Sequence, residues 1–212
     1  DAQESRGLGD VYKRQVIYII SGAWIDMNEQ KERILKGTIQ AFNEKGLKFT
    51  MDDLARILGM SKKTIYVEFT DKNSLFLAMV DYLFDGIKES EEEIINNTDI
   101  DIVDKITTML GVLPESYKDI DLRQLYMLKD KYPVIYKRVE ERFENGWQQT
   151  IELLKEAMEE GKVRKVNVDI FKMMMEAALE QFFQRDILIY NSLSYEEGLK
   201  EVVGILMNGI KL

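Results

Sequence analysis

Residues 50–69 constrain the fold of this chain most, because they hold two short helical patterns separated by one glycine. Thr50 precedes the first pattern and Asp53 follows three residues later, which is the spacing of a capping box. Gly59 stands where a helix often ends in the left-handed conformation, and Ser61 suits the N-cap of a second helix. The stretch therefore predicts a helix-turn-helix.

The outward face of the second helix is basic and aromatic. Ile65 and Phe69 share its apolar side, which leaves a face made of Lys62, Lys63, Tyr66 and Val67. Such a face on a short helix after a glycine turn is typical of a DNA recognition helix. The competing interpretation is a solvated helix surface, because a pattern of this length also occurs in helical proteins that bind no DNA.

The sequence around the motif resembles the N-terminal DNA-binding domain of the TetR (tetracycline-repressor) family of bacterial regulators. The resemblance extends from Met27 to Leu75 and is carried by Ile34, Ala41, Phe42, Gly46, Thr50, Ala55, Gly59, Ser61, Thr64, Ile65, Tyr66, Phe69, Lys72 and Leu75. Lys63 departs from the family pattern, which usually has Gly there, and Glu68 replaces a neutral or basic residue. An acidic side chain repels phosphate, so we expect Glu68 to lie off the DNA or on a cytosine edge.

The resemblance implies an all-α protein with a three-helix helix-turn-helix DNA-binding domain at residues 27–75. A helical ligand-binding and dimerisation domain would follow at residues 76–212. The implied function is a cytoplasmic transcriptional regulator, most simply a repressor, that binds a pseudo-palindromic operator as a homodimer and is released by a small-molecule effector. The residues expected at the DNA are Thr50, Lys62, Lys63, Thr64, Tyr66, Val67 and Lys72. Lys63 and the other polar residues of this set would mostly contact phosphates, whereas Val67 and the outward side of Lys63 are best placed to touch bases.

Charge is distributed unevenly along the chain. Residues 27–75 contain nine basic and seven acidic residues, a net charge of +2, whereas the other residues contain 20 basic and 31 acidic ones, a net charge of −11. A uniformly acidic protein would be repelled by DNA. The positive end therefore supports DNA binding by residues 27–75.

Composition removes several kinds of chemistry. The chain has no Cys and no His, which excludes a Ser-His-Asp triad, thiol chemistry and a Cys/His zinc site. The carboxylate runs, such as residues 91–93, are consecutive and do not converge on one helix face. We expect no enzyme activity, no cofactor and no metal. The alternatives are a helical protein-interaction adaptor or an enzyme that uses carboxylates.

Residues 1–26 lack the periodicity of the rest of the chain. Their apolar run at residues 16–20 is too short to span a bilayer, so we expect no membrane association. We interpret Met27 as the natural start and residues 1–26 as a non-native or unstructured leader.

Six further helices are expected after the helix-turn-helix, and their ends are indicated by caps, glycines and prolines. They are Ser74–Glu93, Ile102–Leu113, Leu122–Lys131, Pro133–Glu160, Asp169–Tyr190 and Ser194–Lys211.

Two functional surfaces are expected on these helices. Wide, deformable side chains suit an effector pocket, for which we select Met79, Tyr82, Leu83, Met109, Tyr126, Trp147, Ile151, Met175 and Phe183. The last two helices carry apolar residues on more than one side, and in the family such helices form the dimer interface. The interface residues expected here are Phe171, Ala178, Phe182, Leu199, Val203 and Leu206.

Overall fold

The computed structural model describes residues 29–114 and 122–212. These residues form helices and no strand, apart from one isolated antiparallel bridge between Val163 and Lys211. The predicted all-α class is confirmed. Within these two ranges, no helix combines the length and hydropathy needed to cross a membrane. The interpretation of residues 1–26 as a leader lies outside the described residues.

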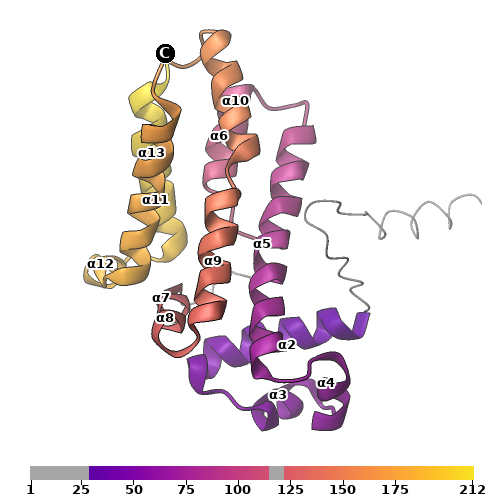
Figure 1. The fold of residues 1–212 in the computed structure, drawn as a ribbon. Helices are drawn as coiled ribbons and strands as arrows, with labels where there is room; N and C mark the ends of the chain where they lie inside the picture. Colours follow the sequence, from indigo (N-terminus) through magenta and orange to yellow (C-terminus); the bar gives the residue numbers. More distant parts are fainter. Residues whose placement is uncertain (1–28, 115–121) are drawn as a thin grey trace, which may run out of the picture. The chain divides into compact units, whose positions relative to one another are not determined.

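The chain divides into two compact units, residues 1–32 and Arg33–Leu212. The first four residues of α2 are the only described part of the first unit, and all the other described helices belong to the second (Figure 1). The described helices in chain order are α2 (Glu29–Lys45), the 3₁₀ helix η1 (Gly46–Lys48), α3 (Met51–Leu58), α4 (Lys62–Glu68), α5 (Lys72–Asn96), α6 (Ile102–Leu110), α7 (Leu122–Tyr126), α8 (Leu128–Lys131), α9 (Pro133–Asn145), α10 (Gln148–Glu159), α11 (Val168–Gln184), α12 (Ile187–Tyr190) and α13 (Tyr195–Ile210).

One hydrophobic core lies among α2, the helix-turn-helix and the beginning of α5. Phe76 of α5 lies at its centre, edge-to-face with Phe42 of α2 and with Phe49 at centroid distances of 6.0 and 5.4 Å. Met79 and Leu83 of α5 belong to the same core, together with residues of α7, α8 and α9. The predicted domain boundary after residue 75 therefore lies inside a continuous helix, and α5 leads directly from the helix-turn-helix into the rest of the chain.

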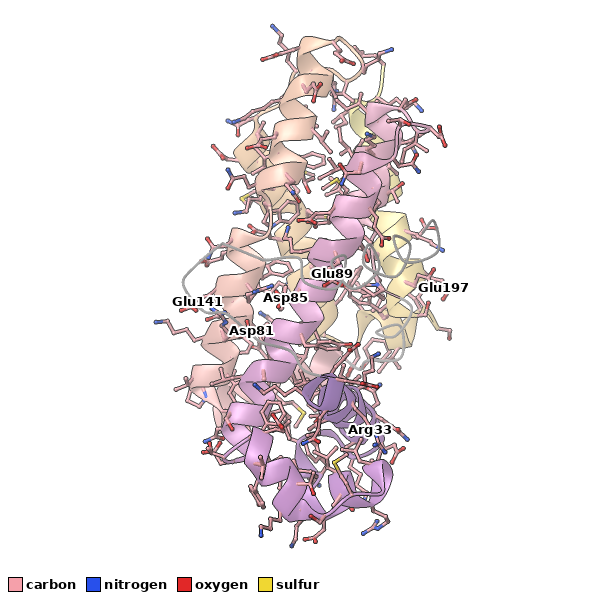
Figure 2. All side chains as sticks on the ribbon, turned by 90° about the vertical axis from the view of Figure 1, so that its right-hand side faces the viewer. Arg33, Asp81, Asp85, Glu89, Glu141 and Glu197 are labelled. Carbon is pink, nitrogen blue, oxygen red and sulfur yellow. The ribbon has the colours of Figure 1, made fainter. Side chains whose placement is uncertain are left out.

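A second core is formed by α6, α10, α11 and α13. Between the two cores, α5 is tied to α9 by ion pairs. Arg138 Nε lies 2.8 Å from Asp81 Oδ1, and Arg142 Nη1 lies 3.6 Å from the same oxygen while its Nη2 donates to Asp85 at 2.5 Å. Figure 2 shows Asp81 and Asp85 on the side of α5 that faces α9.

Two of the predicted helices are interrupted. The helix expected from Pro133 to Glu160 breaks at Gly146, where Lys88 of α5 donates to the Gly146 carbonyl oxygen and also pairs with the buried Glu91. Glycine weakens a helix, and an outside donor satisfies a carbonyl that the broken helix leaves unpaired. The helix expected at Leu122–Lys131 likewise divides at Met127 into α7 and α8.

Local caps set the other helix ends. The long helix begins at Lys72, ahead of the predicted Ser74, because Asp71 and Ser74 form a capping box. The last helix begins as predicted, with Ser194 as N-cap and Glu197 completing its capping box. The predicted Asp169–Tyr190 helix ends at Gln184, and the short α12 follows.

Candidate DNA-binding surface

The N-terminus of α3 is held by a capping box. The Thr50 hydroxyl accepts from the Asp53 N–H at 3.2 Å, and the Thr50 N–H donates to Asp53 Oδ2 at 2.9 Å. Lys45 at the end of α2 donates to Asp53 Oδ1 at 2.6 Å. The hydrogen bond from Lys45, with those from Thr50, holds the pKa of the Asp53 carboxyl well below its usual range. These contacts fasten α3 to the end of α2.

The turn between α3 and α4 follows the predicted pattern. Gly59 ends α3 with φ of +63°, a conformation that costs glycine little. Arg33 of α2 donates to the Leu58 carbonyl oxygen at 2.7 Å, so one of the carbonyl groups at the C-terminus of α3 has a hydrogen-bond partner. The Ser61 hydroxyl accepts from the Thr64 N–H at 3.1 Å and begins α4. The orientation of α4 is therefore set by contacts at both sides of the turn.

The outward face of α4 carries side chains that pack on little else in the protomer. Ile65 is completely buried, whereas Tyr66 is 45% and Val67 74% exposed. Lys63 is also exposed, and across residues 29–114 and 122–212 it forms no ion pair. A cation, a phenol and a small apolar side chain on one short helix are groups that contact phosphates and base edges.

Three other predicted DNA contacts already have partners in the protein. Lys62 Nζ lies 2.9 Å from Asp52 Oδ1, and this hydrogen bond raises the pKa of Lys62. The Thr64 hydroxyl lies 2.9 Å from the Ser61 hydroxyl. The Thr50 hydroxyl also donates to the Asp53 carboxylate. All of these groups lie at the protein surface, so they remain beside the outward face of α4.

Lys72 differs from the other predicted contacts because its ammonium turns into the protein. Its Nζ donates to the Leu47 carbonyl oxygen at 3.0 Å and also to the Phe49 carbonyl oxygen. The ammonium lies 4.1 Å from the centroid of the Phe49 ring. The Lys72 ammonium is therefore held by backbone and ring groups of the segment before α3.

The residues predicted for an effector pocket are divided between the two cores. Met79, Leu83 and Met175 are buried core residues and Met109 is also buried; Tyr82, Trp147 and Ile151 are half-buried. Two of the nine, Tyr126 and Phe183, line a hollow of about 480 Å³ whose other lining residues are Gln124, Met127, Gln184, Arg185 and Asp186. Sequence periodicity missed these five because Met127, Arg185 and Asp186 lie between helices, and Gln124 and Gln184 are polar residues that belong to no apolar stripe.

The residues predicted for the dimer interface face the protomer's own core. Phe171, Phe182, Leu199, Val203 and Leu206 are buried there, and Ala178 is half-buried. Other large apolar residues of these two helices are exposed, and together they are called the outward stripe: Ile170, Met173 and Met174 on α11, and Ile205 on α13. The periodicity of both helices was predicted, but which apolar face lies outward was not.

Carboxylates with shifted pKa values have structural explanations. The pKa values of Asp101 and Glu197 are lowered because each accepts backbone hydrogen bonds at a helix N-terminus. Burial raises the pKa of Glu91, although Lys88 donates to it. In the part of the chain that the structure describes, no three or more acidic side chains gather in a way that could hold a metal ion.

Comparison with known proteins places the helix-turn-helix in a family. Residues 34–79 match the profile of bacterial regulatory proteins of the tetR family. The helix-turn-helix belongs to the TetR family. The matched residues run from α2 to the beginning of α5 and include all of α4. The chain is a DNA-binding transcriptional regulator.

Relatives of the chain extend the similarity over most of its length. It is 28% identical over 179 residues to the HTH-type transcriptional regulator YvaF of Bacillus subtilis, covering 84% of this chain and 94% of that protein. The fold is also similar to a TetR regulator from Haloarcula marismortui, with a TM-score of 0.69, 17% identity and coverage of 88% and 100% of the two chains. The fold is similar to that of FadR of Bacillus subtilis as well, with a TM-score of 0.62, 14% identity and coverage of 84% of this chain and 98% of FadR. Neither the adaptor nor the enzyme alternative gains support from these relatives.

Proposed function

We propose that this TetR-family regulator is a repressor that binds a pseudo-palindromic operator as a homodimer and is released by a small organic effector. In this proposal α4 enters the major groove, with Lys63, Tyr66 and Val67 toward the DNA. The observation that carries it is the exposure of these three side chains on a helix whose inward residue, Ile65, is completely buried. Because its target is chromosomal DNA, we propose that the protein acts in the cytoplasm.

The outward stripe on α11 and α13 supports the homodimer. Ile170, Met173 and Met174 stand at positions i, i+3 and i+4 of α11, and Ile205 on α13 is 70% exposed. Large apolar side chains exposed on two helices that pack together, as α11 and α13 do, favour an interaction site. A two-fold axis through this stripe would bury it and would place two copies of α4 at a fixed spacing.

The hollow beside α7 supports control by a ligand. Its lining combines Tyr126, Met127 and Phe183 with polar groups, as in sites for small organic molecules. Gln124 of α7 lines the hollow and also lies against Gly46, where a β-carbon on the glycine would be 1.7 Å from Gln124 Oε1. Displacing α7 would therefore change the contact at Gly46, directly after the end of α2. A protein of similar fold, FadR of Bacillus subtilis, has been crystallised with stearoyl-CoA.

The experiment that tests the DNA surface is selection of an operator from random DNA, followed by affinity measurement with purified variants. Tyr66→Ala should weaken operator binding roughly 5- to 150-fold, since a specific contact contributes about 1–3 kcal/mol. Lys155→Ala, which removes an exposed lysine of α10, is the control and should bind like the wild type. Equal affinities for Tyr66→Ala and wild type would show that α4 is not the recognition helix.

A further inference from the structure

The side chain of Lys72 reaches from the first turn of α5 to the backbone between α2 and α3. Its ammonium donates to the carbonyl oxygens of Leu47, at 3.0 Å, and Phe49. Leu47 belongs to η1, and Phe49 directly precedes Thr50, the N-cap of α3. The ammonium thus connects the first turn of α5 to the backbone from which α3 begins.

Several contacts hold the Lys72 ammonium at this position. It lies over the rings of Phe49 and Phe76, 4.1 and 5.2 Å from their centroids, where cation–π attraction adds to the hydrogen bonds. Burial, with Lys131 nearby, lowers the pKa of Lys72. Reaching a phosphate would require the ammonium to leave both carbonyl oxygens and both rings, and the carbonyl oxygens would lose a charged donor.

We propose that Lys72 is a positioning residue, which fixes the backbone at Phe49 and Thr50 and thereby the orientation of α3 and α4, and that it does not neutralise a DNA phosphate. Lys63 is the natural comparison, because it is exposed and carries no ion pair in the described ranges. The two roles differ in salt dependence. A lost phosphate contact reduces the salt slope of binding by about 0.9. A misplaced recognition helix lowers affinity while the number of neutralised phosphates, and so the salt slope, stays the same.

The test compares Lys72→Met with Lys63→Met on an operator selected by the wild-type protein, with affinities measured between roughly 50 and 200 mM salt. Methionine keeps most of the apolar stem and removes the charge. We expect Lys63→Met to reduce the slope by about 0.9, and Lys72→Met to lower affinity at least fivefold with the slope unchanged. Lys72→Arg should also lose affinity, because a planar fork cannot take the place of the compact ammonium between two carbonyl oxygens and a ring.

Hydrogen exchange without DNA gives an independent measurement. Lys72→Met should speed exchange of the amides at residues 50–54, and Lys63→Met should not. The proposal is overturned if Lys72→Met reduces the slope like Lys63→Met, or if Lys72→Arg binds like the wild type. If Lys72→Met does not fold, Lys72→Arg decides the matter by its affinity and exchange rates.

Discussion

The outward stripe on α11 and α13 predicts that Ile205→Ala separates the dimer and leaves the protomer folded. Ile205 is 70% exposed in the single chain. Complete burial of a side chain of this size contributes about 1.5–3 kcal/mol, so covering its exposed part contributes about 1–2 kcal/mol. A two-fold interface loses this contribution twice, about 2–4 kcal/mol in all, which corresponds to a roughly 30- to 1,000-fold rise in the dissociation constant of the dimer.

Met174 and Met175 provide the matched comparison on one helix. Met174 is 50% exposed, whereas Met175 is 1% exposed and lies in the second core. Met174→Ala should therefore act like Ile205→Ala, with a smaller rise in the dissociation constant. Met175→Ala should leave a cavity that costs about 2–5 kcal/mol of folding free energy, and so lower the unfolding temperature.

Sedimentation velocity over a dilution series measures the dissociation constants, and thermal unfolding by circular dichroism measures stability. The reasoning requires that the outward residues change association and that Met175 mainly changes stability. An unchanged dissociation constant for both Ile205→Ala and Met174→Ala would refute the interface. So would a larger rise for Met175→Ala than for Ile205→Ala.

Three further outcomes are expected. Gln124→Ala removes the contact with Gly46, so an effector found by ligand screening should release the operator less, even at a concentration that calorimetry shows to saturate the variant. Asp52→Asn frees Lys62 from its ion pair and removes a negative charge beside α4, so operator affinity should rise a few-fold and its salt slope should steepen. The lowered pKa of Asp53 contributes stability that is present above its ordinary value of 3.8 and is lost as pH falls toward the lower folded-state pKa. Asp53→Asn should therefore flatten the decline of the unfolding temperature at acidic pH, and an identical decline in both proteins would contradict this cause.

The helix-turn-helix could be predicted closely because its signals are local. The caps at Thr50 and Ser61 bond to backbone three residues away, and Gly59 ends α3 by its own conformation. Ser194 begins the last helix in the same way. Each of these features depends on residues within one helical turn, so the residue order alone contains them.

The tertiary structure decided which of these residues are available to a partner. Met174 and Met175 are adjacent and chemically identical, yet one is outside and the other is in the core. Lys72 is a lysine like Lys63, but its partners are carbonyl oxygens more than twenty residues earlier in the chain. Helical periodicity indicates that a face is apolar or basic, but the packing of distant segments determines what that face meets. The all-α fold and the helix-turn-helix were therefore determined by the sequence pattern, whereas the outward stripe, the contacts of Lys72 and the hollow beside α7 arise only where separate helices come together.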